Sequence, residues 1–346
     1  MTMTSLPVVA LTLGDPAGIG AELIARLLSR PDATAHANVV LVGDPWLWAR
    51  GQQIAGVAVA TDPIAALAQV RGRADTSRAA FVAVDSIDQA DVTVGQVGAA
   101  GGRSVLRVLD LCMDATLDGA VDAICFAPLN KQAMKLGGLR HEDELHHFAE
   151  HLGVTGYFCE FNTLGGLWTS RVSSHIPLKD AASYLSVARI QAATRLIYES
   201  LRAAGVAQPR VAVAAFNPHG GDGGVCGREE IDVIAPAVQG LNAEGLAGGG
   251  TVDGPFPADT IFLKARDGLY DAIVTMYHDQ GQIAIKLMGF SKGVTVQGGL
   301  PIPITTPAHG TAYDIAGQGR ASDEATWQAF QIATRMGRSL QLQRAA

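Results

Sequence analysis

Three histidines lie in short loop motifs of similar character, and imidazole is the commonest protein ligand for first-row divalent metals. The motifs are Ser-His-Ile-Pro around His175, Asn-Pro-His-Gly-Gly around His219, and Tyr-His-Asp-Gln-Gly around His278. Each lies just beyond a predicted strand and beside a turn-forming residue. With Asp259 or Asp279 as an oxygen ligand, the set suits zinc, or Mg, Mn or Co. The spacing alone leaves solvated or capping histidines as the alternative.

A denser cluster of histidines lies between His141 and His151. The zinc-protease motif His-Glu-x-x-His needs histidine at position 145, where Leu145 stands, so this sequence excludes that function. On a helix that begins near Asp143, the apolar residues form one stripe, while His147 and His151 lie one turn apart on an adjoining face. Two interpretations remain: a polar helical face, or a helix start that points polar groups at a substrate.

The chain also carries two glycine-rich loops, at residues 14–20 (Gly-Asp-Pro-Ala-Gly-Ile-Gly) and 309–319 (His-Gly-Thr-Ala-Tyr-Asp-Ile-Ala-Gly-Gln-Gly). Loops with many small residues let backbone N–H groups approach an anion or a nucleotide closely. Each loop taken singly is also typical of a tight turn. The Gly-x-Gly-x-x-Gly fingerprint of the Rossmann fold does not follow the first predicted strand.

Alternating strands and helices must position these motifs. Short β-branched or aliphatic runs alternate with Ala- and Leu-rich stretches, which predicts an α/β fold around a mostly parallel sheet. The expected strands span Val8–Leu13, Asn38–Val42, Ala80–Val84, Ala123–Phe126, Val211–Phe216 and Ala272–Met276, and the expected helices Ile19–Leu28 and Gly102–Leu117. Because open α/β sheets bind ligands at the carboxyl ends of their strands, the loops after the last two strands are candidate site loops.

Length and composition restrict the class of protein. The chain has 346 residues, of which 48% are hydrophobic and 17% charged, and its formal net charge is −7. The length suggests two domains, with one large α/β domain as the alternative, and an acidic balance without Lys/Arg clusters argues against nucleic-acid binding. No apolar run approaches the ~20 residues that span a bilayer, and the first residues lack the basic region of a signal peptide. We therefore expect no membrane partner and a cytoplasmic location.

Taken together, the motifs resemble the 4-hydroxythreonine-4-phosphate dehydrogenase family over nearly the whole chain, on a fold similar to that of isocitrate and isopropylmalate dehydrogenases. The shared motifs contain Gly14 to Gly20, His175, His219, Asp259, His278, Gly299 and His309. The resemblance implies two α/β/α lobes with an active-site cleft between them, the first formed by residues 1–128 and 290–346 and the second by residues 129–289. It also implies NAD or NADP, a divalent metal, and a homodimer that shares its active sites.

The same resemblance implies roles for individual residues. The metal ligands are His175, His219 and His278, one of them from the other subunit; the catalytic residues are Lys131, Asp259 and Asp279; the substrate-binding residues are Lys286, Thr295 and His147; the cofactor-binding residues are Gly299, His309, Gly310, Thr311, Ala312, Asp314 and Ile315. A solvated helix start is the alternative for Lys131. A metal that chelates the substrate's hydroxyl lowers the pKa of that hydroxyl, which favours hydride loss to NAD(P).

Two positions depart from the family's phosphate-recognising segment: Thr295 replaces an asparagine and Ile304 an arginine. The family's His-Thr-Glu is also missing. Because arginine grips phosphate and isoleucine cannot, these departures favour a phosphate-free carboxylate, a hydroxy acid or cis-dihydrodiol, oxidised with coupled decarboxylation as in the branch that resembles terephthalate dihydrodiol dehydrogenase. The alternatives are an authentic 4-hydroxythreonine-4-phosphate dehydrogenase of pyridoxal phosphate biosynthesis, a metal-dependent lyase without a redox cofactor, and an inactive sensor or scaffold.

Overall fold

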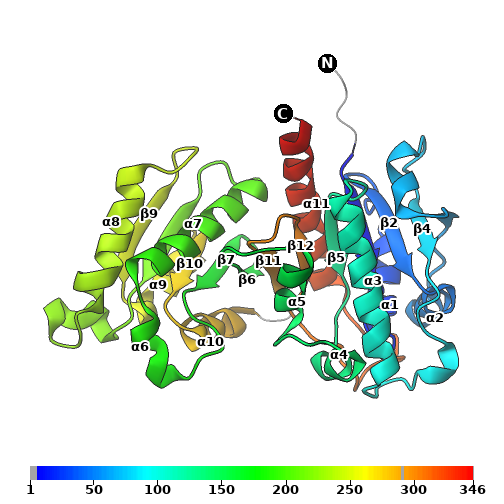
Figure 1. Ribbon diagram of the computed structural model, residues 1–346, viewed down its shortest axis with the longest axis horizontal. Coiled ribbons are helices and arrows are strands. Elements are labelled where there is room, and N and C mark those ends of the chain that lie inside the picture. The colour runs from blue at the N-terminus through cyan, green and yellow to red at the C-terminus, as the bar shows by residue number, and fades with distance from the viewer. Residues whose placement is uncertain (1–5, 290–291, 346) are drawn as a thin grey trace. The chain divides into compact units, whose positions relative to one another are not determined.

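The computed structural model describes residues 6–289 and 292–345, and the chain forms two compact units. Unit 1 contains residues 1–155 and 300–346, and unit 2 contains residues 156–299. Each unit is a sheet with helices packed on it (Figure 1), which confirms the predicted α/β class. Within the described ranges, no helix combines the length and the apolar character that crossing a membrane requires.

The boundaries of the units differ from the predicted lobe boundaries after residues 128 and 289. Residues 129–155 form α4 (Lys131–Gly137) and α5 (Glu144–His151), which pack on α3 (Ala99–Leu117) and so belong to unit 1. The second boundary moves because β11 (Val294–Gly298) pairs with β6 (Cys159–Leu164) inside unit 2. Position 290 itself lies outside the described residues. The corrected boundaries follow residues 155 and 299.

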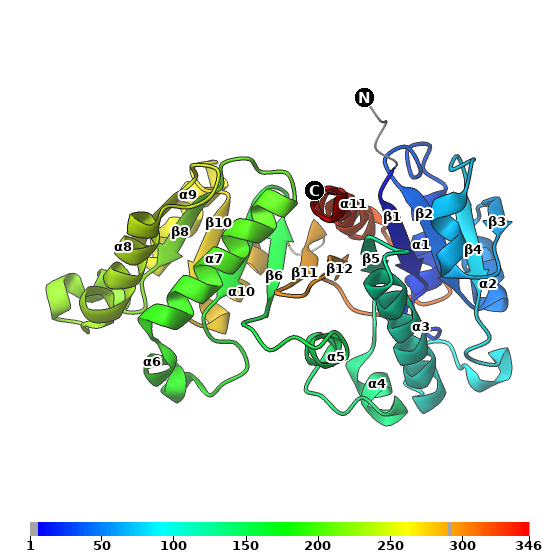
Figure 2. The same ribbon diagram turned by 45° about the horizontal axis from the view of Figure 1, so that its top comes forward.

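Unit 1 is built on a parallel sheet with the strand order β3-β4-β2-β1-β5-β12. Its strands are β1 (Val8–Thr12), β2 (Asn38–Gly43), β3 (Thr61–Pro63), β4 (Ala79–Ala83), β5 (Ala123–Phe126) and β12 (Ile304–Pro307), and its other helices are α1 (Gly20–Leu28), α2 (Pro45–Ala55) and α11 (Glu324–Ala345). Successive residues of a strand face opposite sides. Ile124 and Phe126 of β5 therefore join a core with α3, while Ala123 faces α11. Figures 1 and 2 show these two helices on either side of β5.

Unit 2 is built on a mixed sheet with the order β11-β6-β7-β10-β8-β9, in which β7, β10, β8 and β9 run parallel. Its other elements are β7 (Leu167–Arg171), β8 (Arg210–Ala214), β9 (Thr251–Phe256), β10 (Ala272–Thr275), α6 (Ala181–Tyr184), α7 (Val187–Ala203), α8 (Ala235–Glu244), α9 (Ala258–Arg266) and α10 (His278–Gly289). Ile261 and Phe262 of α9 pack on Ala212 and Ile273 of the sheet. The helix α7 contacts β7, β8 and β10 (Figure 2).

All six predicted strands and both predicted helices are present, and their ends lie within three residues of the predicted ends. The predicted helix near Asp143 is present as α5. It begins after Asp143 because the Asp143 carboxylate accepts a hydrogen bond from the His146 N–H and so caps the helix N-terminus. Its apolar stripe is buried, as predicted, with Leu145 and Phe148 in the core. The strand expected before His175, for which no bounds were predicted, is β7. The strands β3, β6, β9, β11 and β12 were not predicted.

Candidate active site

The predicted metal ligands all follow the carboxyl ends of neighbouring parallel strands in unit 2. His175 comes after β7, His278 begins α10 directly after β10, and His219 comes after β8. These three strands lie side by side in the order β7-β10-β8, and Asp259 follows the next strand, β9. Parallel strands present their carboxyl ends at one edge of the sheet. The topology of unit 2 therefore collects residues that are up to about a hundred positions apart in the sequence.

His175 and His278 lie near each other after two neighbouring strands. Their ring centroids are 6.2 Å apart. Two imidazoles on one tetrahedral zinc ion, with bonds of about 2.1 Å, have centroids about 5.3 Å apart, so sharing an ion requires the rings to approach by roughly 1 Å. The carboxylate of Asp279 lies 2.7 Å from Nδ1 of His278. A hydrogen bond at Nδ1 orients the ring and leaves Nε2 as the ligand atom. This donor set fits a divalent transition metal.

His219 lies in a turn of unusual backbone conformation. Six consecutive residues from His219 to Gly224 have positive φ, between 46° and 101°. For a residue with a side chain this conformation costs roughly 1–2 kcal/mol, and two of the six, His219 and Asp222, carry side chains. Gly221 must be glycine, because an added Cβ would lie 2.7 Å from Oε2 of Glu230. Such strain persists where surrounding contacts impose it, and it is concentrated at functional sites.

The buried carboxylate of Glu230 holds this turn. Its Oε1 accepts hydrogen bonds from the backbone N–H groups of Phe216 (2.8 Å) and Asn217 (2.7 Å), and its Oε2 accepts one from Nδ2 of Asn217 (2.9 Å). Glu230 is 3% exposed. Burial raises the pKa of this carboxyl, but the hydrogen bonds from Asn217 and Phe216 outweigh burial and leave the pKa below its ordinary value. The turn is therefore anchored by an ionised carboxylate.

The lowered pKa of Glu230 predicts a loss of stability in acid. The folded carboxyl binds a proton less readily than the unfolded one, so its contribution is present above the unfolded pKa and disappears as the pH falls through the folded pKa. We expect Glu230→Gln to lower the free energy of unfolding by about 2 kcal/mol at pH 7. Between pH 6 and pH 3 the free energy of unfolding should fall less in this variant than in the wild type. Urea denaturation at several pH values measures both effects. The exposed Glu199→Gln is the control, and an unchanged acid profile in Glu230→Gln would contradict the assignment.

A cavity of about 600 Å³ in unit 2 is lined by His219, Asp259 and Asp279, so the two predicted catalytic carboxylates lie beside a predicted metal ligand. Its apolar wall includes Ile283 and Leu287 of α10, which are 59% and 83% exposed. In the part of one chain that the structure describes, His219 does not belong to any group of three metal-ligand side chains whose ligand atoms lie within 4.8 Å. The cavity therefore places His219 near the carboxylates without completing a three-histidine site inside one chain.

The predicted substrate-binding Thr295 lies in a buried polar cluster of unit 2. Its hydroxyl accepts a hydrogen bond from Nδ2 of Asn162 at 3.3 Å, and Oδ1 of Asn162 accepts hydrogen bonds from Arg171 (2.9 Å) and Gln282. Lys286 lies one turn after Gln282 on α10, with its side chain exposed. Hydrogen bonds of Gln282 and Asn162 thus connect Thr295 with α10, the helix that carries Lys286.

Arg171 is a residue that sequence reasoning missed. It is 5% exposed, donates to Oγ of Ser174 at 2.9 Å and pairs with Glu160 at 3.3 Å. A charged side chain is rarely buried unless it is paired. The signal in the sequence was an arginine directly before Val-Ser-Ser-His175, at the end of the run Leu-Trp-Thr-Ser-Arg.

The two glycine-rich loops pack on each other in unit 1. The Ile19 N–H donates to the Thr311 carbonyl at 3.2 Å, and the Tyr313 hydroxyl donates to Oδ2 of Asp15 at 2.7 Å. Gly18 permits this approach, because an added Cβ would lie 2.9 Å from Cβ of Thr311. Burial raises the pKa of Asp15 more than the hydrogen bond from Tyr313 lowers it. Asp15 and Tyr313 were not predicted as site residues, yet they tie the loops together.

The predicted cofactor loop combines buried anchors with an accessible backbone. Ala312 and Ile315 pack against Ile19, which precedes α1, and Leu23 of α1, and Ala312 has a φ of 44°. Gly310 is exposed, and among the described residues no atom lies within 4 Å of a Cβ added there. An accessible backbone next to a small residue is what close approach of a nucleotide needs. The loop therefore fits a dinucleotide.

The remaining predicted cofactor residues of this loop differ in their surroundings. Asp314 is exposed, and its carbonyl accepts a hydrogen bond from Gln318. His309 is half-buried, and burial lowers the pKa of its imidazole. Gly299 belongs to unit 2, where its φ is 87° and an added Cβ would lie 2.5 Å from the Tyr157 carbonyl oxygen. Contacts within unit 2 alone therefore explain why position 299 is a glycine.

Lys131 and His147 lie in unit 1. Lys131 begins α4, and its Nζ lies 3.6 Å from Oε2 of Glu144, so it is an ion-paired helix start and not simply a solvated one. His147 contacts α3, with Nε2 at 2.7 Å from Oδ1 of Asp110. This contact links α5 to α3, and the substrate-binding role of His147 stays a prediction.

Ile304 is fully buried in the core of unit 1 beside Ile124 and Phe126. The Ile304 side chain therefore faces hydrophobic neighbours. The absence of arginine at position 304 therefore reports how this core is packed, and the inference against a phosphorylated substrate loses its physical basis.

Comparisons with known proteins show similarity over almost the whole chain. A family model described as pyridoxal phosphate biosynthetic protein PdxA matches residues 35–333. A relative from Pseudomonas aeruginosa named putative 4-hydroxythreonine-4-phosphate dehydrogenase 2 is 53% identical over 98% of this chain and 99% of its own. A relative from Bradyrhizobium diazoefficiens named putative D-threonate 4-phosphate dehydrogenase is 36% identical over 94% of this chain and 96% of its own.

Solved structures agree with these sequence similarities. A crystal structure of 4-hydroxythreonine-4-phosphate dehydrogenase from Klebsiella pneumoniae is 33% identical, with a TM-score of 0.82 over 97% of this chain and 99% of its own. A terephthalate 1,2-cis-dihydrodiol dehydrogenase from Burkholderia xenovorans is 27% identical, with a TM-score of 0.67 over 96% and 98% of the two chains. The relatives with the higher identities carry the names of dehydrogenases of 4-phosphates.

Proposed function

Since the chain belongs to the family of the pyridoxal phosphate biosynthetic protein PdxA and is an oxidoreductase, we propose that it oxidises the hydroxyl group of a four-carbon hydroxy acid 4-phosphate. The substrate is 4-hydroxythreonine 4-phosphate or its close analogue D-threonate 4-phosphate, with NAD or NADP as the acceptor. The observation that carries the proposal is the identity of 53% over nearly the full length to a relative named for the first of these compounds. This proposal replaces a phosphate-free dihydrodiol carboxylate as the leading substrate.

The polar cluster of unit 2 supports a phosphorylated substrate. Lys286 is exposed on α10, one turn from Gln282, whose side chain bonds to Asn162 beside Thr295. An ammonium group is a common phosphate ligand. In this proposal Lys286 binds the phosphate, and the cluster beneath it positions α10.

The substrate's own chemistry defines the reaction. The hydroxyl that threonine-like compounds carry on carbon 3 is β to the carboxylate, so its oxidation yields a β-keto acid. A nicotinamide cofactor, when bound, would accept the hydride from carbon 3, and a base on the protein would accept the hydroxyl proton. The product can then lose carbon dioxide, because the electrons of the breaking bond pass into the adjacent ketone. Decarboxylation is thus a chemical consequence of where the oxidation takes place.

The metal would be held by His175, His278 and His219, and when bound it supplies a positive charge that acidifies the substrate's hydroxyl and polarises the new ketone. Asp279 holds the His278 ring through Nδ1. Asp259 lies in the same cavity as His219 and is the proposed base or substrate-orienting carboxylate. Lys131, near Glu144, is the proposed proton carrier.

The proposal includes a homodimer, located in the cytoplasm, in which His219 completes the metal site of the partner subunit. Two observations support this arrangement. Among the described residues of one chain, the three histidines do not form a group whose ligand atoms lie within 4.8 Å of one another, and the cavity that His219 lines has a wall of exposed apolar residues, Ile283 and Leu287. Exposed apolar surface next to an incomplete site is typical of a subunit interface.

A substrate screen tests the proposal. We expect NADH or NADPH formation with 4-hydroxythreonine 4-phosphate or D-threonate 4-phosphate, at a kcat/KM at least about tenfold above that for their unphosphorylated forms, because a bound phosphate contributes charge-assisted hydrogen bonds. Lys286→Ala should raise the KM for the phosphorylated substrate by about tenfold. Lys292→Ala is the matched control. Faster turnover of carboxylated cis-dihydrodiols, with no effect of Lys286→Ala, would refute the substrate class.

A further inference from the structure

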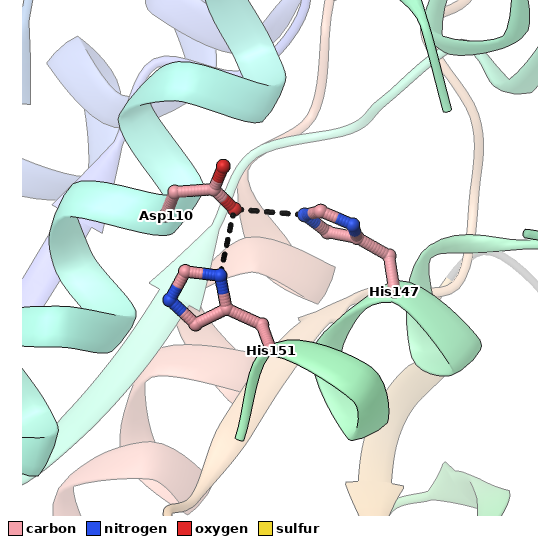
Figure 3. Close-up of side chains that lie close together, drawn as sticks. All are labelled: Asp110, His147 and His151. Atoms are coloured by element: carbon pink, nitrogen blue, oxygen red, sulfur yellow. Dashed lines mark hydrogen bonds and ion pairs between the residues drawn. The ribbon is translucent and has the colours of Figure 1, made fainter. Parts of the chain in front are cut away.

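A second cluster of metal-ligand side chains lies in unit 1, on the helices α3 and α5 (Figure 3). Asp110 comes from α3, and His147 and His151 come from successive turns of α5. One ligand atom of each residue lies within 4.8 Å of the others. These histidines belong to the segment between His141 and His151, which the proposed reaction does not use.

We propose that Asp110, His147 and His151 bind a divalent transition metal, zinc foremost, and that Asp114 orients His151. Two imidazoles and one carboxylate are ligands that zinc accepts in proteins, with water completing the coordination. The site is independent of the proposed catalytic metal, because it uses none of the same residues and lies wholly in unit 1.

The distances between the ligand atoms fit a tetrahedral ion. Oδ1 of Asp110 lies 2.7 Å from Nε2 of His147 and 3.5 Å from Nδ1 of His151. Bonds of about 2.0–2.1 Å at tetrahedral angles place ligand atoms about 3.3 Å apart. The two measured separations fall on either side of this value. Small rotations of the side chains therefore suffice to admit the ion.

Asp114 provides the carboxylate partner that metal-binding histidines commonly have. Its Oδ1 lies 2.8 Å from Nε2 of His151. A hydrogen bond from Nε2 to this carboxylate fixes the tautomer, so that the lone pair lies on Nδ1, the nitrogen that faces Asp110. Asp110 and Asp114 lie one turn apart on α3, which is why both reach the same histidine.

The helices hold these side chains in place and leave a route for the ion. Phe148, between the two histidines in sequence, is fully buried against Phe126, with ring centroids 5.8 Å apart. The side chains of His147 and His151 are 17% and 23% exposed. Partial exposure gives the ion access and room for a water ligand. A bound ion would cross-link α5 to α3.

The competing explanation is that the histidines and aspartates form ion pairs without a metal. The number of zinc ions bound per chain distinguishes the two explanations. After treatment with EDTA and reloading with ZnCl2 followed by gel filtration, elemental analysis is expected to find two zinc ions per chain in the wild type. Asp110→Asn and His219→Asn should each retain one, and the double variant none. Two zinc ions in Asp110→Asn would overturn the inference, whereas two in His219→Asn would overturn the proposed catalytic site.

Calorimetric titration with ZnCl2 in the His219→Asn background tests the roles of individual residues. We expect Asp110→Asn or His151→Gln to weaken zinc binding at least 100-fold, and Asp114→Asn to weaken it by about 10–100-fold as an orienting partner. Asp118→Asn, at the C-terminal cap of α3 and exposed, is the control and should leave binding unchanged. Circular dichroism verifies that each variant is folded. Absence of zinc binding in the folded His219→Asn protein, or equal binding in all variants, would show that the cluster is only a set of ion pairs.

Discussion

Replacing His219 by asparagine is expected to remove one equivalent of metal per chain and to lower kcat at least about 1,000-fold, equivalent to about 4 kcal/mol of activation free energy. The backbone should be retained, because asparagine tolerates positive φ better than alanine does and His219 has a φ of 55°. Its amide is a much poorer ligand than imidazole. Elemental analysis and steady-state kinetics on the same preparation measure the two effects together.

His36→Asn is the control for this experiment, because His36 is exposed and lies in unit 1. It should keep both the metal and the activity. Analytical ultracentrifugation compares the oligomeric states of the variants, so that a loss of assembly is not mistaken for a loss of the ligand. If His219→Asn kept its full metal content and turned over normally, His219 would not be a ligand.

Replacing Gly18 by valine is expected to raise the KM for the nicotinamide cofactor by about 100-fold while metal binding persists. The added Cβ would lie 2.9 Å from Cβ and 3.0 Å from the carbonyl oxygen of Thr311, so the 309–319 loop must move away from the 14–20 loop. A displacement of about 1 Å at a binding site is enough for an effect of this size. Tryptophan-quenching titration with NAD and NADP reports cofactor affinity directly.

Gly72→Val is the matched control, since Gly72 is exposed and no described atom lies within 4 Å of a Cβ added there. Metal content serves as the second readout, because the proposed metal ligands lie in unit 2 and not in the altered loop. Normal cofactor affinity in a folded Gly18→Val protein would mean that the two glycine-rich loops do not bind the dinucleotide.

Local sequence patterns were sufficient to predict the central elements of both units. The strands β1, β2, β5 and β10 are short runs of apolar residues buried on both faces, and α1 and α3 follow helical spacing. A parallel strand buried on both faces must be apolar along its length, so composition alone reveals it. The strands β6 (Cys-Glu-Phe-Asn-Thr-Leu) and β11 (Val-Thr-Val-Gln-Gly) carry polar residues on one face and were not predicted.

Two errors have the same origin, because both concern contacts between segments distant in the sequence. Residues 129–155 carry no composition signal that assigns them to one unit, and their place is decided by packing of α4 and α5 on α3. The resemblance implied that position 304 belongs to a phosphate-recognising segment, whereas the Ile304 side chain lies in the core with Ile124 and Phe126. A motif gives the type of residue at a position, whereas packing decides which way the side chain points.

By itself, the sequence determined the α/β class, the polar residues that follow the strands, and the resemblance to a dehydrogenase family, because these depend on residue type and local spacing. Only the tertiary structure decided which of those residues meet. It placed the ring centroids of His175 and His278 6.2 Å apart. It also placed Nε2 of His147 2.7 Å from Oδ1 of Asp110. It also packed the two glycine-rich loops against each other through Asp15 and Tyr313. Strand order and helix packing set these distances. Both depend on the burial of apolar surface by the whole chain.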